Sequence, residues 1–128
     1  MSEILALAAA GALGAVGRYL VSGWAYRVFG EGFAFGTLVV NVIGCFALAL
    51  FMHAALATDA IPRTLRLAVA VGFLGAFTTF STFGYETVRY LQDGDLRLAA
   101  ANVAANVVVC LLATWAGFAA GRVLIGGA

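Results

Sequence analysis

The sequence predicts an all-α integral membrane protein, a bundle of four helices in which the third helix is broken. Of its 128 residues, 64% are hydrophobic and 10% are charged, with a mean hydropathy of +1.05, which lies outside the usual range of soluble domains. Apolar segments at about 4–28, 33–57, 67–91 and 98–124 each approach or exceed the roughly 20 residues that cross a bilayer. Short connections between them suit a single transmembrane domain, residues 1–128, of antiparallel neighbours.

The first segment is interrupted by Arg18. A cleaved signal peptide would start with a positively charged region, which residues 1–3 do not supply, so we expect a retained helix. Ionisable groups inside a membrane are costly and indicate function, although Arg18 could also reach the headgroups from near the helix end. Both readings, a vestibule or the interface, stay open. Small residues that allow close helix packing recur on this helix: Gly11, Gly14 and Gly17.

The second segment carries Gly36-Thr37-x-x-x-Asn41-x-x-Gly44. Asn41 places an amide in an apolar span, where it can form an interhelical hydrogen bond or serve as an anion ligand. His53 lies near the end of this segment, and we expect it at the interface rather than in a ligand set.

The third segment contains the most unusual stretch, residues 72–83 (GFLGAFTTFSTF), within a run without charge from 67 to 85. Glycine, threonine and serine crowd its middle, so it is a poor plain membrane helix. A weakened helix is tolerated in lipid only where it is buried or lines a cavity, and such interruptions often mark ion sites. We therefore expect the function to reside here.

Two rings of this stretch, Phe80 and Phe83, are spaced by three residues and share a helix face. They can be packing or lipid-facing aromatics. Alternatively, because a phenyl ring has a positive edge, rings turned edge-on beside hydroxyl groups can line a path for a small anion. The hydroxyls between and around the rings favour the second reading: Thr78, Thr79, Ser81 and Thr82.

The fourth segment carries a polar stripe, because Asn102, Asn106 and Cys110 recur every four residues. A stripe of this kind favours a polar path over a single interhelical contact. Cys110 and Cys45 both lie in apolar segments and are expected to be small buried hydrophobic residues rather than a disulfide. Gly117-x-x-x-Gly121 again predicts close helix packing.

Several functions are disfavoured by composition. A net charge of +1 without any lysine gives no case for nucleic acid as a partner. No metal-ligand cluster, nucleophile with a nearby base or phosphate-binding loop is evident, so we expect neither an enzyme nor an organic cofactor. Membrane lipid is the expected surrounding partner.

Loop arginines do not choose an orientation. In a four-span chain the N-terminus, second loop and C-terminus share one side, with Arg63, Arg66 and Arg122. The other side has three or four: Arg27, Arg89, Arg97 and, if it reaches that surface, Arg18. Because arginine excess marks the cytoplasmic side, this balance is either the noise of small counts or a sign that copies insert both ways and pair head to tail.

Three motifs together resemble the Fluc fluoride channels, also called the CrcB family. They are Gly17-Arg18-Tyr19, the Gly36-Thr37-x-x-x-Asn41-x-x-Gly44 pattern, and Gly72-Phe73-x-Gly75-x-x-Thr78-Thr79-Phe80-Ser81-Thr82-Phe83. Asn106 and the character of the last segment agree with the same family.

The resemblance implies an antiparallel, dual-topology homodimer in a bacterial-type inner (plasma) membrane. Its two pores would export cytoplasmic fluoride passively. Asn41 would donate its amide to fluoride, and Phe80 and Phe83 would present ring edges. Further pore-associated groups implied by the resemblance are Ser81, Thr82, Asn106, Thr37 and Glu86, with Arg18 in a vestibule. A structural sodium ion would lie on the dimer axis, bound by backbone carbonyls of Gly75 and Thr78 from both subunits.

The main alternative is a small multidrug-type, proton-coupled exporter, which also has four short helices. That chemistry needs a membrane-embedded carboxylate on the first helix, where this chain has only Glu3 at its extreme start. A non-transporting scaffold subunit is a second alternative, for which the polar interruption of the third segment would be needless.

Overall fold

The computed structural model describes residues 1–127, and within them every regular element is helical. Four helical spans are long and apolar enough to cross a membrane, which confirms the predicted fold class. Two are single helices, α1 (Ser2–Phe29) and α2 (Phe35–Ala57). The third span consists of α3 (Arg63–Arg66), the π-helical η1 (Leu67–Leu74), α4 (Gly75–Phe77) and α5 (Phe80–Gln92). The fourth consists of α6 (Leu96–Ala104), the π-helical η2 (Ala105–Val109) and α7 (Cys110–Ile125).

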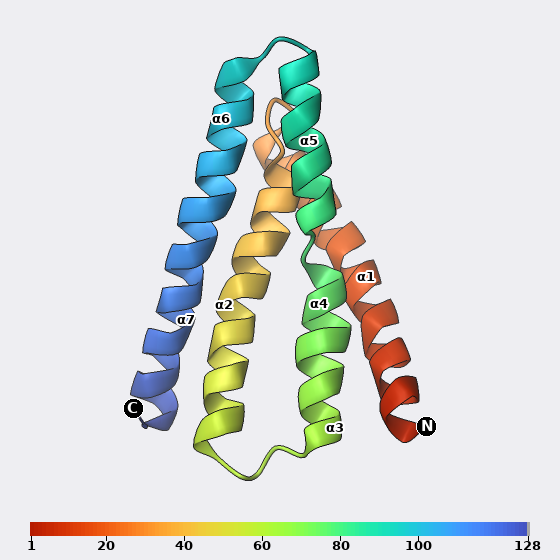
Figure 1. Cartoon of the computed structure of the whole chain (residues 1–128), viewed down its shortest axis with the longest axis vertical. Helices are drawn as coiled ribbons and strands as arrows, with labels where there is room; N and C mark the ends of the chain where they lie inside the picture. Colours follow the sequence, from red (N-terminus) through yellow and green to blue (C-terminus); the bar gives the residue numbers. More distant parts are fainter. Residues whose placement is uncertain (128) are drawn as a thin grey trace.

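The spans alternate in direction, so that the N-terminus, the α2–α3 connection and the C-terminal end lie at one end of the bundle (Figure 1). The α1–α2 and α5–α6 connections lie at the other end. As a result α2 and α7 run in the same direction, and they pack against each other along their length. On the other side, α1 packs against η1 and α4. The break in the third span lies near the middle of the bundle.

The third span is broken at two threonines, not at its glycines. Thr78 (φ −85°, ψ 160°) and Thr79 (φ −151°, ψ 114°) are extended between α4 and α5. Gly72 and Gly75 keep helical geometry on the preceding side. The expected interruption is therefore present. It lies where other groups of the protein replace the helical hydrogen bonds of Thr79.

The helices begin and end close to the predicted segments, with the third span as the largest difference. It begins at Arg63, four residues before the expected apolar start at Leu67. Pro62 precedes it with φ −62°, and proline is favoured at the start of a helix because it has no N–H to satisfy. Hydropathy alone did not predict the helical turn Arg63–Arg66, because charged residues can be helical without being apolar.

Glycines permit the close approach of the spans. A Cβ atom on Gly14 would overlap the Phe73 carbonyl group of η1, and one on Gly117 would lie 2.9 Å from the Cβ of Ala49. Both contacts join helices that are distant in sequence. They confirm that small residues on the first and fourth spans serve close packing within one chain.

Candidate functional site

The Asn41 side chain on α2 clamps the break of the third span. Its Oδ1 accepts a hydrogen bond from the Thr79 N–H at 2.8 Å, and its Nδ2 donates to the Thr79 carbonyl at 3.1 Å. One amide thus satisfies both polar groups of a peptide residue that has left the helix. Because an unpaired backbone group inside a membrane costs several kcal/mol, Asn41 makes the extended conformation of Thr79 tolerable.

A line of hydrogen bonds continues from Asn41 across the fourth span. Asn41 Nδ2 also donates to Asn106 Oδ1 at 3.1 Å. Asn106 Nδ2 donates to Asn102 Oδ1 at 3.0 Å, and Asn102 Nδ2 donates to the Thr87 hydroxyl at 3.0 Å. We call these four side chains (Asn41, Asn106, Asn102 and Thr87) the amide chain. It runs through the bundle interior, where Asn102 and Asn106 are buried.

Hydroxyl groups gather where α5 begins. Thr79 is the N-cap of α5, and its Oγ1 accepts from the Thr82 N–H at 3.1 Å. Hydroxyl groups of Thr82 and Ser81 lie 2.9 and 3.3 Å from the same oxygen. Threonine is a favoured N-cap residue because its oxygen satisfies a free N–H of the first turn. The start of α5 therefore presents a cluster of hydroxyls in mid-span.

The break also changes the partners of two backbone carbonyls. In a continuous helix, Gly75 C=O would accept from the Thr79 N–H, and Thr78 C=O from the Thr82 N–H. Each of these amides donates to a side chain instead, to Asn41 Oδ1 and to Thr79 Oγ1. Gly75 is also exposed and Thr78 half-exposed. Oxygen ligands without a helical donor are what a hard cation requires.

A groove of about 240 Å³ opens beside the amide chain. We call it the phenylalanine groove, because the Phe80 and Phe83 rings line it with their centroids 5.4 Å apart and their planes at 58°. Its other lining residues come from α2, the break and the fourth span: Asn41, Cys45, Thr78, Thr79, Asn106, Val107 and Cys110. The groove thus combines amides, hydroxyls and aromatic rings, and no acidic side chain lines it.

A larger groove, of about 580 Å³, lies between α1, α2 and α5. We call it the arginine groove because Arg18 lines it, together with Thr37, Thr79 and Thr82. Thr79 lines both grooves, so the break separates two hollows. Arg18 lies in this groove and forms no ion pair with Glu86 within residues 1–127.

Thr37 and Glu86 join α2 to α5. The Thr37 hydroxyl donates to Glu86 Oε1, and Glu86 Oε2 is buried with no hydrogen-bond donor among the described residues. A buried carboxyl oxygen without a donor is unusual among the polar atoms of folded proteins. Glu86 also lines a smaller hollow near the α1–α2 connection.

The structure brings most of the predicted residues together around the break. The phenylalanine groove contains Asn41, Phe80, Phe83 and Asn106, and the arginine groove contains Arg18, Thr37 and Thr82. Ser81 joins the hydroxyl cluster. Thr87 was not singled out by sequence, and Thr79 was named only as one of the hydroxyls beside the rings. A threonine is a favoured N-cap residue, which could have indicated the role of Thr79 at the start of α5. No comparable signal in the sequence indicates Thr87.

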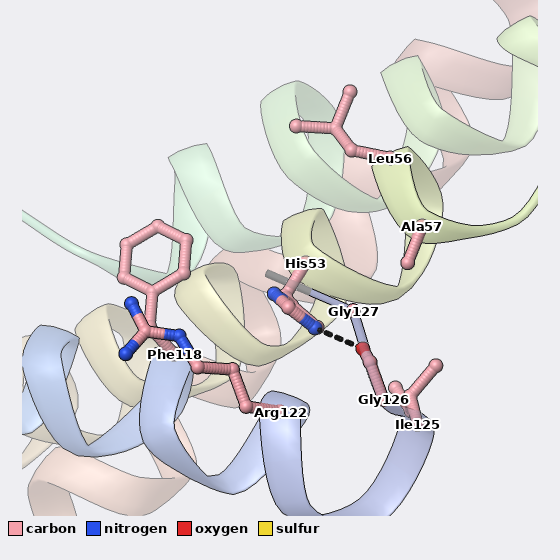
Figure 2. A pocket seen from close by; sticks show the side chains of 8 residues that line it. All are labelled: His53, Leu56, Ala57, Phe118, Arg122, Ile125, Gly126 and Gly127. Atoms are coloured by element: carbon pink, nitrogen blue, oxygen red, sulfur yellow. Dashed lines mark hydrogen bonds between the residues drawn. The ribbon is translucent and has the colours of Figure 1, made fainter.

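His53 belongs to a separate hollow at the terminal end of the bundle, shown in Figure 2. It is buried against Gly121, and its Nε2 lies 2.9 Å from the Gly126 carbonyl oxygen. This hydrogen bond fastens the end of α7 to α2. Arg122 and Phe118 line the same hollow of about 510 Å³. His53 thus lies near the end of α2, and the Gly126 carbonyl is its structural partner.

Four membrane spans, with a broken helix that separates two polar grooves, define a multi-pass membrane protein built to handle an ion within the bilayer. Comparison with known proteins identifies the family. A family model described as CrcB-like protein, Camphor Resistance (CrcB), matches residues 5–118. The chain belongs to this CrcB family.

Curated relatives cover nearly the whole chain. A Geobacter metallireducens protein named fluoride-specific ion channel FluC is 52% identical over 122 residues, which are 95% of this chain and 98% of the relative. A protein of the same name from Geobacter sulfurreducens is 52% identical over 124 residues, which are 97% of this chain and 100% of the relative. Another, from Pelobacter propionicus, is 48% identical over 127 residues, which are 99% of this chain and 98% of the relative.

Proposed function

We propose that the chain is a fluoride-selective ion channel that exports cytoplasmic fluoride passively. The observation that carries the proposal is the phenylalanine groove, in which Phe80, Phe83, Asn41 and Asn106 meet at the break of the third span. The names of the relatives identify fluoride as their ion. An ion channel performs no chemical step, so this function agrees with the expectation that the chain is not an enzyme.

The chemistry of the groove suits a small anion. Fluoride is strongly hydrated, so a pore must replace water with directed donors, or desolvation becomes a barrier. Amide and hydroxyl groups supply N–H and O–H donors, and the positive edges of the phenyl rings supply a weaker attraction. Ser81 and Thr82 extend the donors past the break, and Thr37 and Glu86 continue the line of polar groups toward the α1–α2 end of the bundle. Several modest sites in series permit exit as well as entry.

We propose that two copies assemble in antiparallel orientation and form two pores. Support comes from the surface of a single chain, where Phe80, Ser81 and Thr82 are exposed in mid-span. Lipid cannot hydrogen-bond to exposed hydroxyls, so a second copy is the natural cover for this surface. The balance of loop arginines suits insertion in both orientations.

We further propose a structural sodium ion at the centre of the dimer. Its ligands would be the carbonyls of Gly75 and Thr78, contributed by both copies. The residues fit the ion, because side chains take the amides that would otherwise occupy these carbonyls. The ion would supply positive charge and fix the two breaks against each other.

The small multidrug-type exporter finds no support in the structure or the relatives. Glu3, the carboxylate of the first helix, lies at the bundle end and is 3.5 Å from Arg63 Nε. It therefore cannot serve as a mid-membrane proton carrier. The four spans and the bacterial relatives support the proposed location, the bacterial inner membrane.

Reconstituted liposomes test the function. Vesicles loaded with fluoride and carrying the purified protein should release it rapidly once a potassium ionophore removes the opposing voltage. Protein-free vesicles and vesicles loaded with chloride serve as controls. A fluoride-tight membrane, or efflux that requires a proton gradient, would contradict the proposal.

A further inference from the structure

Both cysteines of the chain line the phenylalanine groove. Cys45 lies on α2, four residues after Asn41, and Cys110 begins α7, four residues after Asn106. Asn41 and Asn106 are joined by a hydrogen bond of 3.1 Å. Because α2 and α7 run in the same direction, an advance of one helical turn on each leads from this bonded pair to the pair of cysteines.

The side chains agree with this placement of the two cysteines one turn beyond Asn41 and Asn106. Both thiols are free and half-buried, and both line the phenylalanine groove. Cys45 and Cys110 are far apart in sequence and reach the groove from different spans, α2 and α7. A single buried cysteine is ordinarily a small hydrophobic residue. Packing alone gives no reason for two thiols to meet beside amide groups in an open groove.

We propose that Cys45 and Cys110 form a binding site for a soft, thiol-seeking metal cation, and that the bound cation obstructs the groove. Thiolates bind soft metals in preference to hard ones. In residues 1–127, no three histidine, cysteine or acidic side chains lie close enough together to hold one metal ion. The site therefore suits an ion that accepts two ligands in line, such as Hg²⁺, Ag⁺ or Cu⁺, rather than tetrahedral Zn²⁺. Binding replaces each S–H proton with the metal and releases two protons.

The position of the site determines its consequence. The cation would lie one turn beyond the Asn41–Asn106 pair and share the groove with Phe80 and Phe83. A bridge between the two sulfurs would close this part of the groove to an anion. The obstruction rests on the proposed channel function, whereas the binding site does not.

Binding is measured first, with Hg²⁺ as the probe and an excess of a monothiol such as cysteine as competitor. The competitor removes mercury from isolated thiols but not from a two-thiol chelate, because the second bond forms within the site at a high effective concentration. Elemental analysis after desalting should find one mercury per chain in the wild type. Cys45→Ser and Cys110→Ser should each bind at least about 100-fold more weakly.

Alanine replacements at the same positions guard against poor folding of the serine variants, and elution from a sizing column monitors assembly. Equal mercury retention by the wild type and the double variant Cys45→Ala/Cys110→Ala would overturn the site.

Flux is measured on the same preparations, each compared with its own untreated rate. Stoichiometric Hg²⁺ should abolish fluoride efflux in the wild type and leave the double variant unaffected. Mercury bound at one per chain with undiminished efflux would overturn the obstruction. If the untreated protein conducts no fluoride, the channel function fails, and the mercury stoichiometry still decides the site.

Discussion

Asn41 shows how one side chain can serve structure and transport together. Its Nδ2 donates to the Thr79 carbonyl and to Asn106 Oδ1, and its Oδ1 holds the Thr79 N–H. The sequence left two readings for Asn41, an interhelical hydrogen bond and an anion ligand. The interhelical bond is present, and its partner is the backbone of the break. An anion that takes an amide proton from Asn41 must therefore compete with Asn106 or Thr79, which keeps any such site weak enough to release the ion.

Replacement of Asn41 by leucine should suppress fluoride flux and loosen the break. Leucine leaves the Thr79 N–H and carbonyl without their partner, at a cost of at least about 1–3 kcal/mol for each group. Faster amide hydrogen exchange over residues 78–83 would report the loosening, and liposome efflux the transport. Thr114→Val is a matched control, because the Thr114 hydroxyl bonds only the Cys110 carbonyl of its own helix. Wild-type flux and exchange in Asn41→Leu would remove Asn41 from both roles.

Replacement of Phe80 or Phe83 by isoleucine should lower flux while the dimer persists. Phe80 is 82% exposed in the single chain, so its ring contributes little to folding of the chain. Isoleucine retains apolar bulk but has no positive ring edge, and loss of a contact worth about 1 kcal/mol in the transition state corresponds to several-fold to tenfold slower efflux. Phe118→Ile, in the separate hollow beside Arg122, is the control. Unchanged efflux in both groove variants would assign these rings to packing.

At the scale of elements, composition was enough to predict the helices but not their irregularities. Hydropathy located all four spans, and the hydroxyl-rich stretch correctly predicted a broken third one. The residues of the break could not be predicted, because they depend on a hydrogen bond between Asn41 and Thr79, 38 residues apart. The π-helical segments η1 and η2 likewise have no proline or other local signal. η1 packs against α1, and η2 packs against α2.

The contact of α1 with η1 should depend on the absence of a side chain at Gly14. A Cβ atom there would overlap the Phe73 carbonyl and lie 3.1 Å from the Cβ of Ala76. Gly14→Ala should therefore destabilise the fold by about 1–3 kcal/mol, the usual cost of overpacking. Thermal or denaturant unfolding in detergent would measure it. Gly23→Ala on the same helix has no atom within 4 Å and should be neutral, or stabilising by up to about 1 kcal/mol. Equal stability of the two variants would show that α1 can move away from η1 without cost.

For the whole molecule, the site could be predicted only in part because it is shared by spans far apart in sequence. The polar stripe of the fourth span and the amide of the second were visible in sequence. That Asn102, Asn106 and Asn41 form one continuous line follows only from the bundle. The partner of the exposed surface around Phe80 is not determined by the fold of one chain. Because loop arginines set the orientation of a membrane protein, changing their balance tests how the copies are oriented.

Arginine replacements should produce two variants of the chain, each inserted mainly in one orientation. Each variant should then need the other for activity. Arg63→Ala/Arg66→Ala removes positive charge from the end with the termini, and Arg89→Ala/Arg97→Ala removes it from the opposite end (Figure 1). Because loop arginines favour the cytoplasmic side, each variant should insert mostly in one orientation, opposite to the other. The Arg63–Glu3 and Arg89–Asp93 ion pairs that are lost are exposed and contribute about 1 kcal/mol or less.

If the working unit is an antiparallel dimer, each variant alone should conduct fluoride poorly, because it lacks an oppositely oriented partner. Expression of both variants in the same cells should restore efflux from vesicles of those membranes. A reporter fused to the C-terminus gives the orientation of each variant, and the wild type should show both. Full efflux from a variant inserted in one orientation only would exclude the antiparallel dimer and favour a parallel assembly or a single-chain pore.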